Sequence, residues 1–316
     1  MIRTTMLPHV SIDDVRAAAE RIAAHINHTP IATSTTLDAE IGGSVFFKLE
    51  SQQKIGAFKA RGALNAALQL SPEEAALGVL THSSGNHGQA LAYAAATIGI
   101  ACTVIVPDDA PQVKVDAMRG YGAQIVSCPH QERVETMERV RAETGATLVH
   151  PFNDSRVIAG QGTAALELLE QVPGLDVVIA PVGGGGLMSG TTVTVRSLSP
   201  QTRLIGAEPQ QVDDAAVSLA RGAIQPATGK PTIADGLRTS LLELTFDILS
   251  AGGIEIVTVS EDEIAEAARF HLFRMKHVVE PSGATGLAVV RKLASELTDQ
   301  RVGVIVSGGN TDLGWL

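Results

Sequence analysis

The stretch "LDVVIAPVGGGGLMSGTTVTV", residues 175–195, decides the fold class, because a strand, a glycine run and a helical segment follow one another in it. Residues 175–182 are almost continuously apolar and β-branched, as in a strand of a parallel sheet that is covered on both faces. The glycines that follow allow a tight turn in which several backbone N–H groups converge. With a helix N-terminus behind them, they predict an anion site that suits a phosphate.

The glycine run alone leaves two interpretations open. It lacks the GxGxxG spacing of dinucleotide sites, and Gly229-Lys230 is followed by Pro231, so no Walker A motif is present. The run therefore indicates either a phosphate site of another kind or a turn that needs glycine only for its backbone geometry.

Further apolar runs indicate the same architecture along the chain. Helical patterns follow the runs at 78–83, 102–107 and 123–128, and similar runs stand at 202–208, 254–259 and 301–307. Strands that alternate with helices in this way predict an α/β fold with open parallel sheets. Ligands of such sheets bind beyond the carboxyl ends of the strands, which here read "SSGNHG", "GGGG" and "SGGN". Residues 222–232, with two prolines and two glycines, are the best loop candidate.

Composition excludes several classes of protein. The 316 residues are 45% hydrophobic and 18% charged, which predicts a globular chain of one large or two smaller domains. The net charge of -10 and the absence of a basic run argue against nucleic acid as a partner. The sequence shows neither a signal peptide nor a membrane span. Two cysteines, Cys102 and Cys128, do not make a disulfide framework, so we expect small buried thiols and a soluble cytoplasmic protein.

Lys59 stands in the run "GAFKARGALNA", residues 56–66, among small and apolar neighbours. A lysine in a poorly solvated site has a lowered pKa, and its neutral amine can form a Schiff base with a carbonyl compound. A small ligand that carries both an aldehyde and a phosphate is pyridoxal 5'-phosphate. The alternative is a lysine in the first turn of a helix that extends to water.

Eight motifs then occur in an order that resembles the fold type II pyridoxal-phosphate enzymes, and within them the serine/threonine dehydratase and serine racemase group. They are "GAFKARGALNA", "THSSGNHGQALAYAA", "HPFNDSRVIAGQGT", "PVGGGGLMSG", "GAEPQQVDDA", "TIADGLRTS", "VEPSGATGLA" and "VSGGNTDL". The resemblance covers residues 15–313. It implies the tryptophan synthase β-like fold, with two open parallel-sheet domains and the cofactor in the cleft between them. Residues 1–75 and 152–316 would form the large domain, residues 76–151 the small mobile domain, and two chains a homodimer.

The same resemblance implies a role for each residue of the cofactor site. Lys59 would carry the cofactor as a Schiff base and later remove the substrate α-proton. Phe58 would pack on one face of the pyridine ring, and Asn86 would bond its hydroxyl. The phosphate would lie on Gly183, Gly184, Gly185 and Gly186. Ser307 would face the ring nitrogen, where a neutral hydroxyl weakens the electron sink and so favours prompt loss of a β-leaving group.

Residues for the substrate follow from the same motifs: Ser83, Ser84, Asn86 and His87 would bind the carboxylate, and Arg133 and Thr239 would contact the substrate elsewhere. A serine at Ser84 would lie opposite the lysine, as in the racemase-like members, and could return a proton. His87 could equally be bonded to a backbone carbonyl. The helix around Arg133 also reads as an ordinary charged face, which is the simpler interpretation.

A divalent cation site is implied by "GAEPQQVDDA". Glu208, Asp214 and the backbone carbonyl of Val212 match the metal ligands of the racemase-like group, and oxygen ligands suit Mg²⁺, Ca²⁺ or Mn²⁺. Two acids at this spacing otherwise form a solvated face.

We therefore expect a pyridoxal-phosphate dependent dehydratase that converts threonine or serine to a 2-oxo acid and ammonia. Two alternatives in the same class stay open: a serine racemase, and a dehydratase for hydroxyaspartate or a bulky β-substituted serine. Phe152 favours the dehydratases, because the racemase pattern has asparagine at this position. A binding protein without catalysis is a third alternative, against which the intact Lys59 and Ser307 argue.

Overall fold

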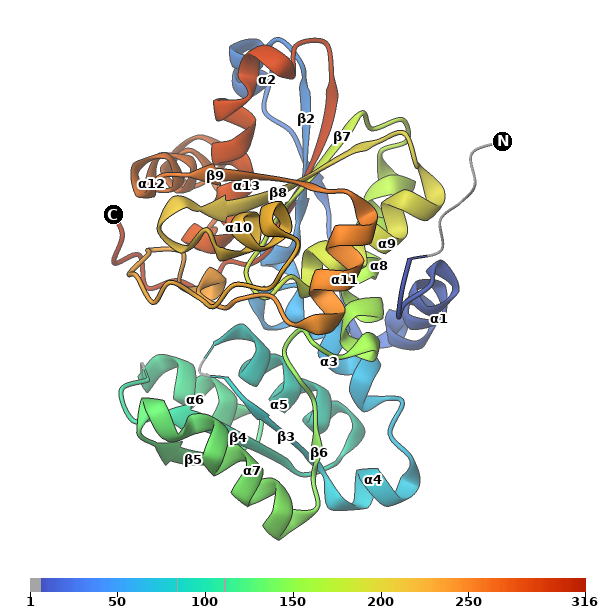
Figure 1. The fold of residues 1–316 in the computed structure, drawn as a ribbon, viewed down its shortest axis with the longest axis vertical. Coiled ribbons are helices and arrows are strands. Elements are labelled where there is room, and N and C mark those ends of the chain that lie inside the picture. The colour runs from blue at the N-terminus through green and yellow to red at the C-terminus, as the bar shows by residue number, and fades with distance from the viewer. Residues whose placement is uncertain (1–6, 84, 111) are drawn as a thin grey trace.

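The computed structural model describes residues 7–83, 85–110 and 112–316, and it contains two separate sheets (Figure 1). The larger sheet has six strands in the order β1 (Ile31–Ala32), β2 (Ser44–Leu49), β10 (Arg301–Val306), β7 (Val177–Pro181), β8 (Arg203–Pro209) and β9 (Glu255–Val259). The smaller sheet has four strands in the order β5 (Gln124–Cys128), β4 (Cys102–Pro107), β3 (Val79–His82) and β6 (Thr147–Leu148). The predicted α/β class with open parallel sheets is confirmed.

All seven apolar runs named from the sequence form strands. Three strands were not predicted: β1, β2 and the short β6. In β2 the lysine Lys48 breaks the apolar pattern, although its side chain is fully buried. β1 differs in direction as well, because it pairs with β2 antiparallel at the edge of a sheet whose other pairs are parallel.

Thirteen α-helices are described. They are α1 (Ile12–Ile22), α2 (Thr35–Ile41), α3 (Lys59–Ala67), α4 (Pro72–Leu77), α5 (Asn86–Ile98), α6 (Gln112–Gly120), α7 (Arg133–Thr144), α8 (Ser155–Gln171), α9 (Gly186–Leu198), α10 (Asp214–Arg221), α11 (Glu243–Gly252), α12 (Glu261–Phe270) and α13 (Pro281–Lys292). No helix in the described part of the chain has both the length and the hydropathy needed to cross a membrane.

Helices cover both faces of the larger sheet, which explains why its strands are apolar on both sides. Buried residues of α2, α12 and α13 form one core with Val45, Phe47 and Leu49. On the opposite face, residues of α8, α9 and α11 pack with Val178, Ala180 and other strand residues. Burial on both faces removes the polar alternation that an exposed face would show.

The smaller sheet repeats this arrangement. α5 and α6 pack on one face, in a core that includes Cys102, and α7 packs on the other, in a core that includes Cys128. Both cysteines are buried and free, as predicted. α3 lies where the two parts of the molecule meet and contacts both α5 and α8 (Figure 1). The helix that begins with Lys59 is thus held between the two sheets.

Candidate active site

Strand ends from both sheets meet around the start of α3. The backbone N–H of Phe58 donates to the carbonyl of Ser307, 3.0 Å away, at the end of β10. The neighbouring residues Ala57 and Gly308 form a β-bridge. These backbone contacts hold the segment that carries Lys59 beside Ser307, although 248 positions separate the two residues in the chain.

The amine of Lys59 has an unusual environment. Its Nζ donates to the carbonyl of Pro151 at 2.7 Å and lies 5.1 Å from the centroid of the Phe58 ring. Desolvation by burial lowers its pKa from 10.5 to about 8. A substantial fraction of this amine is therefore neutral near physiological pH, which a nucleophile or a base requires.

The glycine run packs against Phe152, the residue that follows Pro151, whose carbonyl accepts the hydrogen bond from Lys59. A Cβ at Gly184 would stand 2.3 Å from the ring of Phe152, and a Cβ at Gly186 would stand 2.8 Å from Cβ of Phe152. Gly185 has a left-handed φ of 83°, and α9 begins at the next residue. Close packing and the turn therefore both require glycine here. The glycine run ends at the N-terminus of α9, where the first backbone N–H groups of the helix have no partner within the helix.

Asn86 begins α5 after the end of β3, and both ends of its amide are bonded. Its Nδ2 donates to both carboxylate oxygens of Glu280, at 2.9 and 3.2 Å, and its Oδ1 accepts from Nδ2 of Asn310 at 2.8 Å. Burial raises the pKa of Glu280 to about 7, against the opposing effect of the Asn86 bond. The sequence interpretation assigned no role to Glu280. In the sequence, only its place in the motif "VEPSGATGLA", directly before Pro281, could have indicated a role for Glu280.

The predicted carboxylate loop is described only in part. Ser83 Oγ accepts from the N–H of Gly85 at 3.3 Å, and Ser84 lies outside the described residues. The ring of His87 is buried, and its Nε2 lies 3.0 Å from the carbonyl of Val149. Of the two possibilities left open for His87, the structure shows the bond to a carbonyl.

Two more histidines, which the sequence interpretation left without a role, surround this region. The rings of His82 and His150 lie 5.7 Å apart and edge to face, and His150 contacts Phe152 in the same manner at 4.7 Å. Nδ1 of His150 accepts from the N–H of Asn153 at 2.9 Å. Burial, with the nearby charges of His82 and Lys59, lowers the pKa of His150 to about 4, so its ring is neutral at pH 7.

Arg133 and Thr239 have different surroundings. Arg133 begins α7, and its Nε is buried without a hydrogen-bond acceptor among the described residues. Its charge, after desolvation, is the second cause that lowers the pKa of His82. The charge of Arg133 is therefore close to the end of β3, and its side chain is partly exposed. Thr239 is exposed in the segment that follows the short helix η6 (Asp235–Leu237).

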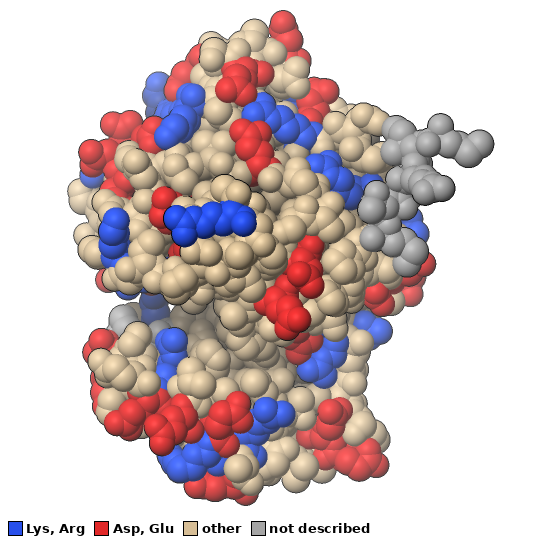
Figure 2. All heavy atoms as spheres, viewed as in Figure 1, with Lys and Arg blue, Asp and Glu red and all other residues tan. Residues whose placement is uncertain are grey.

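A large cavity opens at Asn310 and Pro281, between the parts of the molecule that hold the two sheets, and neither Arg133 nor Thr239 lines it. Its volume is about 880 Å³, and Lys114, Asp235, Arg238, Pro281 and Asn310 are among the residues that line it. Figure 2 shows the surface hollowed between the two parts. Lys114 of α6 and Asp235 of η6 form an ion pair of 2.7 Å across this opening. A small molecule can thus reach Asn310, which bonds directly to Asn86.

The predicted metal ligands are both buried: Glu208 lies near the end of β8, and Asp214 is the first residue of α10. The carboxylate of Glu208 accepts from the N–H groups of Ala215 and Ala216 at 2.8 and 2.9 Å. Both oxygens of Asp214 are buried and meet no donor within the described ranges. Burial raises the pKa of Glu208 to about 8 and that of Asp214 to about 6. No cluster of three or more His, Cys, Asp or Glu side chains suited to a metal occurs among the described residues, so such a site would need backbone carbonyl or water ligands as well.

Fold and site together define the class of this protein. A model of the family described as pyridoxal-phosphate dependent enzyme matches residues 22–308. The chain belongs to the family of pyridoxal-phosphate dependent enzymes.

Several proteins with assigned activities are similar to this chain over almost its whole length. The chain is 50% identical to the beta-hydroxyaspartate dehydratase of Paracoccus denitrificans (strain Pd 1222), over 95% of this chain and 96% of that protein. It is 47% identical to the serine racemase of Dictyostelium discoideum, over 96% of both chains. Among solved structures, the serine racemase of Dictyostelium discoideum superimposes with a TM-score of 0.92 at 45% identity, covering 96% of this chain and 99% of that one. A solved threonine deaminase gives the same TM-score, identity and coverage.

The residues present fit pyridoxal phosphate. The amine of Lys59, with its pKa near 8, suits the aldehyde. The glycine run offers the start of α9 to the phosphate, and a Cβ at Gly183, 2.9 Å from Cα of Leu237, would not be accommodated there.

Proposed function

We propose that this chain is a pyridoxal-phosphate dependent ammonia-lyase that eliminates water from a β-hydroxy amino acid, and that 3-hydroxyaspartate is its preferred substrate. The observation that carries the reaction type is the amine of Lys59, whose pKa is about 8 and which donates to the carbonyl of Pro151, next to the Phe152 that contacts the glycine run. The relatedness to a beta-hydroxyaspartate dehydratase supports the choice of substrate.

The bound cofactor supplies the electron sink that makes the α-hydrogen of an amino acid acidic. Lys59 is the base of the reaction, because its neutral amine accepts the proton from the α-carbon. When the cofactor is bound, Phe58 would support one ring face, Asn86 would bond the ring hydroxyl, and Gly183 to Gly186 would hold the phosphate. The neutral hydroxyl of Ser307 would face the ring nitrogen. Overall, the α-hydrogen and the β-hydroxyl leave as one water molecule. Hydrolysis of the resulting unsaturated amine by a second water yields a 2-oxo acid and ammonia.

The loop formed by Ser83, Ser84, Asn86 and His87 binds the α-carboxylate through its backbone N–H groups in this proposal. Arg133 binds the second carboxylate of hydroxyaspartate. The support is the position of its charge, which acts on His82 at the end of β3, the strand that leads into this loop, since a guanidinium pairs well with a carboxylate. Threonine and serine lack this carboxylate and would not form the ion pair. Thr239, which is exposed beside the cavity-lining Arg238, contacts the substrate only after the cleft closes.

An assay for ammonia and 2-oxo acid tests this function on the stereoisomers of 3-hydroxyaspartate, threonine, serine and bulky β-substituted serines. We expect the highest kcat/KM with one isomer of hydroxyaspartate. Arg133→Met should lower that value by about 100-fold or more while changing the value for serine much less. The substrate proposal fails if serine or threonine is preferred, and the lyase proposal fails if every substrate is silent.

Racemisation of serine is the second candidate, because the serine racemase of Dictyostelium discoideum is 47% identical to this chain. The racemase role of Ser84 is tested by chiral analysis of the serine that is left after incubation. Ser84→Ala should abolish any racemisation and preserve elimination, since only the return of the proton would need this hydroxyl.

Four further features belong to the proposal. Residues 1–75 and 152–316 form the large domain and residues 76–151 the small mobile domain, which accords with the division of strands between the two sheets.

Mg²⁺, or Ca²⁺ or Mn²⁺, binds Glu208, Asp214 and the carbonyl of Val212. The support is that both buried oxygens of Asp214 lack a donor among the described residues. Two chains form a homodimer, which light scattering tests. The enzyme works in the cytoplasm, where its two free cysteines would stay reduced.

A further inference from the structure

A cluster of four charged side chains, three of them fully buried, is centred on Arg61, two residues after Lys59. The guanidinium of Arg61 contacts Glu50 through Nε and Nη2, at 2.7 and 2.8 Å, and Glu167 through Nη1 and Nη2, at 2.7 and 2.9 Å. Lys48 contacts the same Glu167 at 2.5 Å. The side chains of Arg61, Glu50 and Lys48 are fully buried, and that of Glu167 is 13% exposed.

Neutral hydrogen-bonding groups complete this cluster. Thr163 accepts from Nη1 of Arg61 at 3.1 Å, and Thr29 donates to Glu50 at 2.6 Å. Lys48 also donates to the carbonyl of Thr29 and to Gln171. Two positive and two negative groups balance one another, and the pKa of Arg61 is raised above its ordinary value although desolvation opposes this. Hydrophobic residues of the same volume could fill such a site, so stability alone does not account for these four charges.

The position of Arg61 suggests what the cluster does. Arg61 is the third residue of α3, two residues after Lys59, and its N–H bonds the carbonyl of Phe58 at 3.0 Å. Within the described ranges, the N-terminus of α3 has no side-chain cap. The first turn of this helix, which holds Lys59, is therefore anchored by Arg61 to Glu50 after β2 and to Glu167 in α8.

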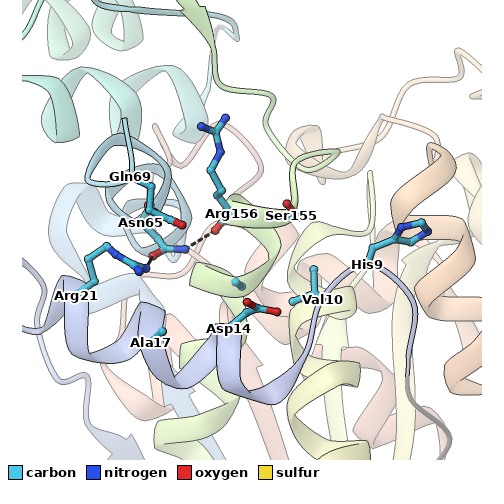
Figure 3. A pocket seen from close by; sticks show the side chains of 10 residues that line it. His9, Val10, Asp14, Ala17, Arg21, Asn65, Gln69, Ser155 and Arg156 are labelled. Carbon is cyan, nitrogen blue, oxygen red and sulfur yellow. Dashed lines mark hydrogen bonds between the residues drawn. The ribbon is translucent and has the colours of Figure 1, made fainter. Parts of the chain in front are cut away.

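The remainder of α3 is held in place by a second contact. Figure 3 shows Asn65 between α1 and α8, with Arg21 and Arg156 as its partners. Its Oδ1 accepts from Nη1 of Arg21 at 2.5 Å, and its Nδ2 donates to the carbonyl of Arg156 at 2.6 Å. Between these contacts, a Cβ at Gly62 would stand 2.7 Å from the carbonyl oxygen of Val157 in α8. α3 can therefore neither slide nor rotate on α8 without breaking buried polar contacts.

We infer that Arg61 is a positioning residue for the reaction: its fork to Glu50 and Glu167 fixes the depth and rotation of the first turn of α3, and thereby the point at which the amine of Lys59 meets its reaction partner. This inference rests on the role proposed for Lys59. An error of about 1 Å in such a position can reduce a rate by about 100-fold, so the rigid anchor has a catalytic rather than only a structural purpose.

Arg61→Lys tests the inference in the cofactor-loaded enzyme, because lysine keeps the charge and loses the fork. Lys48→Met is the matched control, since Lys48 belongs to the same cluster but lies on β2 and not on α3. For each variant we would measure kcat, KM, the melting temperature and the visible absorption of the bound cofactor between pH 6 and 10. Substrate for these assays is the hydroxy amino acid that the wild-type enzyme prefers.

Arg61→Lys should lower kcat by about 30-fold or more, change KM by less than about threefold, and shift the pH midpoint of the visible band. Lys48→Met should lower the melting temperature by a similar amount with kcat within about threefold and the band unmoved. The inference is overturned if Arg61→Lys keeps kcat and band, or if both variants lose kcat in proportion to stability.

If Arg61→Lys does not fold, Glu167→Gln decides the question, because the amide keeps the shape and weakens the fork. A lower kcat with a shifted band supports the inference, and unchanged values overturn it. A colourless wild-type protein would instead contradict the proposed function, so the two failures are distinguishable.

Discussion

The carboxylate of Glu280 accepts from Nδ2 of Asn86 at both of its oxygens, at 2.9 and 3.2 Å, across a sequence separation of 194 residues. The pair joins the start of α5, next to the smaller sheet, to the start of α13, next to the larger one. The amide assigned to the cofactor ring is therefore oriented by a buried carboxyl group that bridges the two parts of the molecule.

Replacing Glu280 by alanine should weaken cofactor binding about tenfold, because Asn86 would lose the partner that orients its amide. Fluorescence titration of the apoprotein with pyridoxal phosphate measures this. Glu266→Gln, an exposed acid in α12, is the control and should bind normally. Unchanged affinity in Glu280→Ala would mean that Asn310 alone orients the amide.

Capture of pyridoxal phosphate by the apoprotein should depend on pH through Lys59. Only the neutral amine adds to an aldehyde, and burial sets the pKa of Lys59 at about 8. The rate should therefore rise from pH 6 to about pH 8 and level off above it. Borohydride trapping followed by peptide mass mapping locates the modified lysine. Preferential modification of the exposed Lys54 would contradict the assignment.

Alanine at Gly184 should destabilise the fold by about 1–3 kcal/mol, because its Cβ would stand 2.3 Å from the ring of Phe152. Urea unfolding of Gly184→Ala measures the cost. The double variant with Phe152→Leu should recover part of it, since the smaller side chain leaves room. Gly120→Ala, where nothing lies within 4 Å of the new Cβ, should be neutral or stabilising. If the double variant recovered none of the loss, the Phe152 contact would not be its cause.

Added Mg²⁺ should raise the melting temperature, because it would pair the two buried oxygens of Asp214. Thermal unfolding with about 1 mM MgCl₂ or with a chelator shows the shift. Asp214→Ala should abolish it, while Asp213→Ala, one residue earlier and partly exposed, should preserve it. A shift that survives in Asp214→Ala would place the ion elsewhere.

Acid should destabilise the fold through His271, which lies in the π-helix η7 (His271–Met275) against the ring of Phe47. Burial, with smaller effects of His277 and Arg291, lowers its pKa to about 3, whereas the unfolded chain titrates near 6.5. The unfolded state therefore binds the proton first, and stability should fall by up to about 1.4 kcal/mol per pH unit below pH 6. His271→Leu should flatten this slope in urea unfolding between pH 7 and 5. Exposed His130→Leu should not.

Local patterns in the sequence were sufficient to predict seven strands, the loop at 222–232 and the candidate residues around Lys59 and Gly183 to Gly186. Each depends on neighbours in the chain: apolar runs, glycines at a strand end, and a lysine with small neighbours. β2 was missed because Lys48 interrupts its pattern, and only its contact with Glu167 in α8 explains how a lysine is buried there.

The sequence alone determined the α/β class, the strand ends that can bind a ligand and the residue types that suit pyridoxal phosphate, because these follow from short-range periodicity and side-chain chemistry. Tertiary structure decided which distant groups meet: Glu280 with Asn86, Arg61 with Glu167, and the ring of Phe152 with the glycine run. The physical reason is that burial and charge pairing are properties of packed neighbours. A pKa of about 8 at Lys59 therefore arises only when segments far apart in the chain exclude water from its amine.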